Sequence, residues 1–461
     1  MPDNYLRQNR QTLNLGVIKV ARDLFPGYEL KMAYSIPQGV FCKLNGSVLS
    51  EREVKQIEEK LHEWVACNCP IEFLCKKKGF YQYQVGEDTI VKSIYPANAL
   101  TSAIGPFRIF PFSTGFIIQF GDTEDELKAP LVFPEKLSAT YEKTQKWLDN
   151  INVELISDVN AYIDANRSEE LIGIAEALQE KEISDIADVI LSQRRTVRGL
   201  LISGPSSSGK TSFAHRISTQ LRVNGLVPFP LSLDNYYLNR DQVPLDKDGN
   251  YDFECLEALD LKLLQDHAIR LINGETVETP IFDFKTGKRS ERTIPMHLGT
   301  SELLVIEGIH ALNPNLLPAI DRNLFFRIYI SALFELNVDM VNRIPTTEVR
   351  LIRRLVRDDR FRETGAADTF SRWASVRQGE YNYIFKHQEE ADMMFNSSLI
   401  YELNALRPFA EASLEKMPGD SAHALSKERL LNILSFAKPM DTSKVPFNSI
   451  LREFIGGSIY F

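Results

Sequence analysis

The sequence predicts an α/β protein in which a helix-covered parallel sheet carries a phosphate-binding loop, preceded by a smaller α+β domain. A complete phosphate-loop motif lies at residues 204–211, between an apolar run of strand length and a helical pattern. From about residue 195 onward, strand-like and helical patterns alternate, which is typical of a parallel sheet covered by helices. Before residue 150, short β-like runs are instead separated by glycine and proline.

The size and charge of the chain limit the function classes. A chain of 461 residues is long for one core, so we expect two or three domains. The net charge of −9 argues against general binding to nucleic acids or membrane surfaces. No apolar run approaches the roughly 18 residues of a membrane span, and the first ten residues lack the apolar core of a signal peptide. We therefore expect a cytoplasmic protein that does not bind membranes.

Five cysteines in a chain of this length do not indicate a disulfide framework. Cys67, Cys69 and Cys75 cluster in a C-x-C-x₅-C spacing, which raises the alternative of a metal site. This spacing lacks a nearby fourth ligand of the usual kind. We expect reduced, structural cysteines.

The chain divides by pattern into residues 1–150, 151–194 and 195–461. In the first region, residues 115–120 predict a strand. Residues 50–67 predict a helix, because Ser50 and Glu53 form a capping box. Residues 151–194 predict a helical connector, since apolar residues in 168–192 fall largely three and four positions apart.

The phosphate-loop motif reads G-P-S-S-S-G-K-T, which satisfies the pattern G-x-x-x-x-G-K-[S/T] in full. Backbone N–H groups of such a loop and of the following helix N-terminus hold phosphate oxygens. We expect Lys210 to reach the β- and γ-phosphates and Thr211 to bind Mg²⁺. The sequence therefore predicts binding of a nucleoside triphosphate. The expected contacts from this segment are Gly204, Pro205, Ser206, Ser207, Ser208, Gly209, Lys210, Thr211 and Ser212.

Asp234 follows an apolar strand-like run at residues 231–233. In an open α/β sheet, the carboxyl ends of the strands face the ligand crevice. A carboxylate there can orient and deprotonate an attacking hydroxyl, as phosphoryl transfer to an alcohol requires. The alternative for Asp234 is a helix cap or a turn residue.

Glu307 ends a second apolar run, at residues 303–306. This is the Walker B arrangement, in which the acid holds Mg²⁺ directly or through water. Buried strands also commonly end in an acid for solubility, so this pattern alone is weak evidence for a Walker B acid. The phosphate loop upstream strengthens the interpretation. We expect His310, close behind, to be structural.

Residues 350–362 contain six arginines in thirteen positions. Such a run could be a solvated helix face or a nucleic-acid patch. In an acidic protein with a phosphate loop, a lid over the triphosphate fits better, since guanidinium groups bind phosphates in bidentate fashion and neutralise charge in the transition state.

Residues from about 195 to 400 resemble the uridine kinase/phosphoribulokinase family of P-loop kinases. The matching segments are GPSSSGKTS, SLDNYY, GNYDFE, PIFDF, VIEGIH and RLIRRLVRDDRFR. The resemblance implies a P-loop kinase fold and an ATP-dependent kinase with Mg²⁺ as cofactor. The enzyme would transfer the γ-phosphate to a hydroxyl of a small acceptor, such as a nucleoside or a sugar-like molecule.

The resemblance also implies roles for individual residues. Asp234 would be the catalytic base, and Thr211 and Glu307 would surround Mg²⁺. Asp252 would contact ribose hydroxyls, and Tyr237 would lie at the acceptor pocket. The catalytic set is then Asp234, Lys210, Arg357 and Arg362. Arg354 joins the nucleotide contacts and, with Arg357 and Arg362, forms the lid. The acceptor contacts are Tyr237, Asp252, Phe282 and Phe284.

The chain resembles most closely a bacterial uridine kinase-like branch with an N-terminal region related to threonyl-tRNA synthetase. The segments NRIPTTEVRLIRR, SVRQGEYNYIF, EEADMMFNSSLIYEL and LREFIGGS resemble this branch, and LFPGYELKMAYSIPQGVFCKL resembles the synthetase's second additional domain. Where that domain has an H-x-x-x-H pair, this sequence has Leu15 and Lys19. We therefore expect no metal binding and no tRNA-editing chemistry in residues 1–150.

Three positions depart from the kinase pattern. Nucleoside kinases of the family carry a base-reading histidine where this chain has Gly287, and a tyrosine where it has Phe282. A site that hydrogen-bonds its substrate draws much of its discrimination from those groups, so the resemblance leaves base specificity open. A later lid arginine is replaced by Thr364, with Arg360 as the candidate substitute.

Other classes of nucleotide-binding protein fit the sequence less well. A GTPase would need an N-K-x-D-like segment and an ABC-type ATPase an L-S-G-G-Q-like segment, and the sequence contains neither. The remaining alternative is a nucleotide-dependent RNA-binding or regulatory protein that uses the kinase fold as a switch. The expected base Asp234 argues against it, since a switch needs no base for an alcohol acceptor. The sequence leaves the oligomeric state open, a homo-oligomer included.

Overall fold

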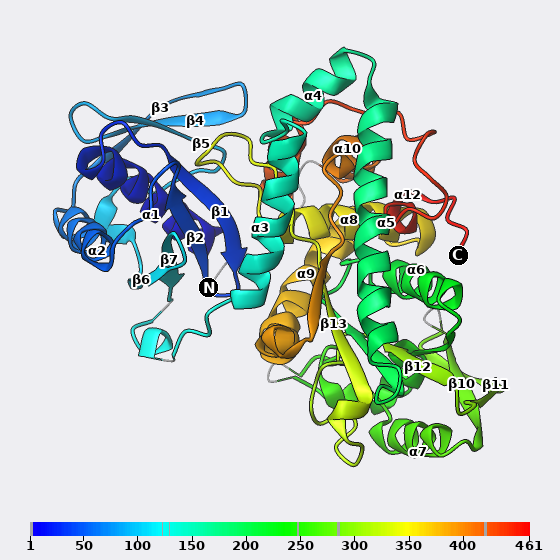
Figure 1. Cartoon of the computed structure of the whole chain (residues 1–461). Helices are drawn as coiled ribbons and strands as arrows, with labels where there is room; N and C mark the ends of the chain where they lie inside the picture. Colours follow the sequence, from blue (N-terminus) through cyan, green and yellow to red (C-terminus); the bar gives the residue numbers. More distant parts are fainter. Residues whose placement is uncertain (1–2, 122, 129, 247–248, 284–285, 419–421) are drawn as a thin grey trace. The chain divides into compact units, whose positions relative to one another are not determined.

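The computed structural model describes residues 3–121, 123–128, 130–246, 249–283, 286–418 and 422–461. The chain forms two compact units, each assembled from three separate segments. Unit 1 comprises Met1–Ser168, Phe334–Val349 and Leu403–Met440, and unit 2 comprises Glu169–Leu333, Arg350–Glu402 and Asp441–Phe461. Figure 1 shows the elements of both units along the chain. The linear division into residues 1–150, 151–194 and 195–461 stays a prediction.

Unit 1 contains two antiparallel sheets, with strand orders β1-β2-β7-β6 and β3-β4-β5. The strands are β1 (Leu30–Ile36), β2 (Gly39–Leu44), β3 (Ile71–Lys77), β4 (Phe80–Val85), β5 (Ile90–Ser93), β6 (Phe107–Phe112) and β7 (Gly115–Phe120). The helices are α1 (Asp3–Leu24), α2 (Glu51–Ala66), α3 (Glu135–Asn150), α4 (Ile156–Asp164), α11 (Ala424–Leu434) and most of α10 (Glu402–Glu415). The predicted strand at residues 115–120 is confirmed as β7.

Helix α2 begins as its sequence predicts. The Ser50 hydroxyl accepts a hydrogen bond from the Glu53 amide at 3.3 Å, and the Glu53 carboxylate accepts one from the Ser50 amide at 2.8 Å. This reciprocal box satisfies two amides that the first helical turn would leave without partners. The helix buries one face into the core of unit 1, through Val54, Ile57, Leu61 and Trp64.

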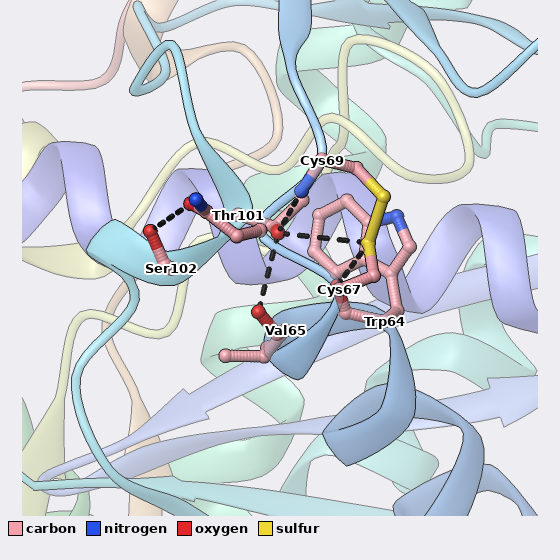
Figure 2. Close-up of a disulfide and its surroundings, with 7 residues drawn as sticks. Trp64, Val65, Cys67, Cys69, Thr101 and Ser102 are labelled. Carbon is pink, nitrogen blue, oxygen red and sulfur yellow. Dashed lines mark hydrogen bonds between the residues drawn. A yellow bond between two sulfur atoms is a disulfide. The ribbon is translucent and has the colours of Figure 1, made fainter.

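Cys67 and Cys69 form a disulfide, so the expectation of reduced cysteines is wrong for this pair. The turn at Asn68, with φ of +50°, brings the two Cα atoms to 5.3 Å, within the range that a disulfide spans. Figure 2 shows the Thr101 hydroxyl beside the pair, where it accepts a hydrogen bond from the Cys69 amide at 3.0 Å. Cys42, Cys75 and Cys255 are free.

Unit 2 is built on a five-stranded sheet in the order β14-β13-β8-β12-β9, in which every pair is parallel. The strands are β8 (Gly199–Ser203), β9 (Val227–Ser232), β12 (Glu302–Glu307), β13 (Phe325–Ser331) and β14 (Met393–Asn396). A separate antiparallel hairpin joins β10 (Thr276–Asp283) to β11 (Lys288–His297). The α/β class and the parallel sheet are confirmed.

The helices of unit 2 include α5 (Ser168–Ser192), α6 (Lys210–Val223), α7 (Leu261–Ile272), the arginine-rich part of α8 (Thr346–Phe361), α9 (Ala366–Gly379) and α12 (Arg452–Ile455). The helix predicted at residues 168–192 is confirmed as α5. Helix α6 packs against β8, β9 and β12. Among the described helices, none combines the length and the apolar character that crossing a membrane requires.

Two glycines inside helices give a matched test of this packing. A Cβ atom at Gly16 in α1 would lie 2.4 Å from the buried Trp64 ring, whereas one at Gly173 in α5 would meet no atom within 4 Å. Alanine is favoured over glycine in a helix interior by up to about 1 kcal/mol. We expect Gly173→Ala to raise the unfolding temperature and Gly16→Ala to lower it, measured by circular dichroism. A Gly16→Ala variant as stable as Gly173→Ala would contradict the Trp64 contact.

Candidate phosphate-transfer site

The pairing of three strands brings the phosphate loop, Glu307 and Asp234 to one edge of the sheet. Glu307 at the end of β12 lies in register with Ile202 on β8 and with Ser232 on β9. The phosphate loop leaves the carboxyl end of β8, and Asp234 lies in the short 3₁₀ helix that follows β9. The two neighbours of β8 are β12 and β13, so the strand order reverses there, which is where open α/β sheets bind ligands.

Glycine is required at both ends of the phosphate loop by close approaches. A Cβ atom on Gly204 would lie 2.3 Å from the Ile330 carbonyl oxygen, and one on Gly209 would lie 2.6 Å from the Ile450 side chain. Gly209 also has a φ of +85°, in the left-handed region that favours glycine. The Ser207 side chain and the Ser208 side chain are buried within this loop.

Lys210 is partly buried, and three nearby carboxylates act on its charge. Its ammonium group donates to the Pro205 carbonyl at 3.1 Å, which folds the side chain over the loop. The surrounding protein removes water from Lys210 and lowers its pKa, and the charges of Glu307, Asp234 and Glu453 oppose that shift. An approaching phosphate chain would therefore meet a lysine already held at the mouth of the loop.

Both predicted acids have a raised pKa. Burial, and secondarily the nearby Asp234 carboxylate, raise the pKa of Glu307 to about 7, while Lys210 and the Ser232 hydroxyl act against the shift. The Ser232 hydroxyl donates to Glu307 at 2.7 Å. Desolvation also raises the pKa of Asp234, against the opposing charges of Lys210, Arg362 and Arg357. The site thus holds two carboxylates that a cation would stabilise in their ionised forms.

These residues fit a magnesium ion. Mg²⁺ is commonly bound by one or two carboxylates together with substrate phosphates. Thr211 lies in the first turn of α6, which follows the loop, and Glu307 ends β12, which pairs with β8 before the loop. The repulsion between Glu307 and Asp234 is what a divalent cation would relieve. Glu307 and Thr211 would hold the ion, in the roles predicted for them.

Five of the six arginines in residues 350–362, on α8 and directly after it, form two groups. Arg354, Arg357 and Arg362 gather around Asp358, with nitrogen–oxygen distances of 3.2, 3.0 and 3.8 Å. Arg354 also donates to the Ser206 hydroxyl at 3.1 Å, and the charges of Arg357 and Arg362 act on Asp234. The three arginines expected in the lid therefore lie beside the phosphate loop and the expected base.

Arg350 and Arg353 donate hydrogen bonds to the backbone of the phosphate loop, a role that the run of arginines in the sequence did not predict. Arg350 donates to the Ser206 carbonyl at 2.9 Å, and Arg353 donates to the Ser207 carbonyl at 3.3 Å. Both side chains are almost fully buried and form ion pairs with the buried Glu380 and Glu402, respectively. A run of arginines in the sequence does not show which members are buried and which face the site.

The residues predicted to contact the acceptor include Tyr237, Asp252 and Phe282. The rings of Tyr237 and Phe282 have centroids 5.9 Å apart, and the Tyr237 hydroxyl donates to the Phe253 carbonyl at 3.2 Å. Asp252 accepts from the Tyr383 hydroxyl at 3.3 Å. Phe284 lies outside the described residues.

Gly287 stands where the resemblance would place a base-reading histidine. Its φ is +67°, and a Cβ atom there would lie 3.4 Å from the Arg240 side chain. The Arg240 amide donates to the Gly287 carbonyl at 3.0 Å. The local backbone therefore favours glycine itself, and the imidazole contact is absent from this position.

Two further groups lie near the site: Glu254, for which no role was predicted, and His310, which was expected to be structural. Burial raises the pKa of Glu254 to about 7, although Arg354 and Lys210 act against the shift. His310 is also buried, which lowers its pKa to about 4, so it is neutral near pH 7, and its ring lies edge-on to Tyr383. The GNYDFE segment offered a signal for Glu254, since it places this acid two residues after Asp252.

Residues 200–401 match the model of the phosphoribulokinase/uridine kinase family. The uridine kinase of Mycoplasma genitalium is 30% identical over 200 residues, which are 43% of this chain and 84% of that protein. The chain belongs to the phosphoribulokinase/uridine kinase family. Uridine kinases of Bacillus pumilus and Lactobacillus johnsonii are 29% and 28% identical, each over 39% of this chain and 77% of the relative.

The family match covers the parallel sheet, the phosphate loop and the arginines of α8. It therefore supports an ATP-dependent kinase for that part of the chain. A solved structure described as a possible uridine kinase from Bacillus stearothermophilus is 20% identical, covers 47% of this chain and 100% of that chain, and has a TM-score of 0.30. The P-loop kinase fold is assigned from the strand order of the five-stranded sheet. The resemblance of residues 1–150 to a synthetase stays a prediction.

The raised pKa of Glu307 gives a test in the absence of nucleotide and metal. Because its pKa rises from 4.5 to about 7 on folding, the folded state holds a proton that the unfolded state releases. The contribution of Glu307 to stability is therefore largest below its unfolded pKa and is lost as the pH rises toward the folded pKa. In urea unfolding at about pH 5 and about pH 8, we expect Glu307→Gln to lose less stability over this range than the parent.

The surface variant Glu275→Gln, whose partner is Arg270, is the control and should behave like the parent. Equal pH dependence in the parent and in Glu307→Gln would show that Glu307 does not hold a proton in the folded state.

Proposed function

We propose that this protein transfers the γ-phosphate of ATP to a hydroxyl group of a small acceptor, a nucleoside or a sugar-like molecule. The main observation behind this proposal is that three predicted features lie together at one edge of the sheet. The phosphate loop, Glu307 and Asp234 follow three strands whose register places them together. Membership of the phosphoribulokinase/uridine kinase family supports the kinase reaction.

Binding of the nucleotide would use the loop and its charges. The backbone amides of residues 204–212 and the N-terminus of α6 would hold the phosphate oxygens. Lys210 would contact the β- and γ-phosphates, and Thr211 and Glu307 would hold Mg²⁺. When bound, Mg²⁺ neutralises charge on the phosphates.

Transfer itself would depend on Asp234 and the three arginines around Asp358. The Asp234 carboxylate, whose pKa is raised by desolvation, would accept the proton of the acceptor hydroxyl. Arg354, Arg357 and Arg362 would stabilise the charge on the transferred phosphoryl group, as guanidinium groups do when fixed beside phosphates. Asp358 holds these three arginines close together before substrate arrives.

The acceptor site supports recognition of a sugar more directly than recognition of a base. Asp252 presents a carboxylate that can accept hydrogen bonds from vicinal hydroxyls, and Tyr237 and Phe282 supply an aromatic wall. Gly287 provides no side chain to read a base. We therefore propose that the sugar-like part of the acceptor contributes most of its recognition, with Phe284 as a further predicted contact.

Lys210→Ala should abolish the rise in unfolding temperature that Mg·ATP produces, because a ligand stabilises a protein only by binding to its folded state. Differential scanning fluorimetry measures this shift. The control is Lys181→Ala, an exposed lysine on α5 that pairs with Asp185, and it should retain the shift. A Lys210→Ala variant that is stabilised as much as the parent would show that the phosphate site is elsewhere.

Asp234→Asn should leave ATP affinity within a few-fold and lower acceptor phosphorylation by about 10²–10⁴, the usual cost of removing a general base. Asparagine is nearly isosteric, so the loss is chemical. ATP affinity by calorimetry and turnover should be measured on one preparation, with the exposed Asp266→Asn on α7 as control. If Asp234 is only structural, its variant should instead show lower stability and weaker ATP binding, with unchanged turnover by the folded fraction.

A further inference from the structure

The segment Asp441–Phe461 belongs to unit 2 and lies outside residues 200–401, which the family model matches. Its apolar residues are anchored firmly, since Ile450, Leu451, Phe454 and Ile455 are buried. The guanidinium of the buried Arg353 lies 5.1 Å from the centre of the Phe454 ring. This segment is therefore a fixed part of unit 2.

The segment lies against the phosphate loop. Ile450 packs on Gly209, where a Cβ atom would come within 2.6 Å of it. Three residues after Ile450, the Glu453 carboxylate accepts a hydrogen bond from the Ser212 hydroxyl at 2.7 Å. Ser212 is fully buried and directly follows Thr211 at the start of α6.

Glu453 places a negative charge beside the loop that is expected to hold the phosphate groups of a nucleotide. Its charge acts on Lys210 and on Glu307, so the carboxylate lies within electrostatic range of the centre of the loop. The N-terminus of a helix attracts phosphate groups, and a carboxylate at the same place competes for that attraction. The hydrogen bond also directs the Ser212 hydroxyl toward Glu453.

We propose that Glu453 is a positioning residue that sets how tightly the phosphate loop holds a nucleotide. This inference rests on the nucleotide site proposed above. It adds a residue that affects nucleotide affinity and lies outside the segment that the family model matches. The fixed negative charge opposes the bound phosphate chain and weakens the affinity for ADP, which favours release of that product. The hydrogen bond to Ser212 keeps the carboxylate at this position.

The test measures binding of Mg·ADP and of adenosine to the full chain by calorimetry. Glu453→Gln keeps an oxygen that can accept from Ser212 but removes the charge. We expect it to bind ADP roughly three- to tenfold more tightly than the parent, a change in the range of carboxylate effects at helix N-termini. Adenosine affinity should stay the same, because adenosine carries no phosphate. The gain for ADP should shrink as ionic strength rises.

Two variants separate charge from structure. Glu453→Asp keeps the negative charge and shortens the side chain by one methylene group, so its ADP affinity should remain closer to that of the parent than to that of Glu453→Gln. Glu275→Gln changes the net charge equally at an exposed pair with Arg270 and should leave ADP affinity unchanged. A purely structural Glu453 would instead give weaker ADP binding and a lower unfolding temperature in Glu453→Gln.

The proposal is overturned if Glu453→Gln binds ADP no more tightly than the parent, or if Glu453→Asp or Glu275→Gln produces the same gain. If the parent itself binds neither ATP nor ADP, the proposed function fails together with this inference. Binding by the parent without a gain in Glu453→Gln refutes the role of Glu453 alone.

Discussion

The parallel pairing of β8 with β12, and of β12 with β9, is the constraint on which the candidate site depends. Because the side-chain period of a strand is two, a slip of one residue between β12 and β9 would turn Glu307 away from Ser232. The same slip between β12 and β8 would turn Glu307 away from the phosphate loop. The pairing also fixes the raised pKa of Glu307, since burial between neighbouring strands and the nearby Asp234 both follow from it.

Buried charges then hold the loop in its binding conformation. Arg350 and Arg353 donate to carbonyl groups of the loop and are each paired with a buried glutamate. Removing one member of such a pair would leave an uncompensated charge in the interior. The loop is thus organised before a nucleotide arrives, and the arginines around Asp358 make no hydrogen bond to its carbonyl groups among those described, although Arg354 donates to the Ser206 hydroxyl.

Local patterns in the sequence were sufficient to predict the parallel sheet, the phosphate loop between β8 and α6, and the strands that deliver Asp234 and Glu307. These features depend on neighbouring residues. The sequence did not predict the Cys67–Cys69 disulfide, which depends on the turn at Asn68. Nor did it predict that Glu453 contacts Ser212, because only the folded chain brings two segments so far apart in sequence together.

The most direct test of the central claim is acceptor-dependent release of ADP. The parent protein would be incubated with Mg·ATP and a panel of nucleosides and sugar phosphates, with ADP followed by a coupled assay and the acceptors analysed by mass spectrometry. Phosphoryl transfer at this site predicts that at least one acceptor raises ADP release far above the rate with ATP alone and gains one phosphoryl group. An equal rate with every acceptor, with no phosphorylated product, would contradict the account.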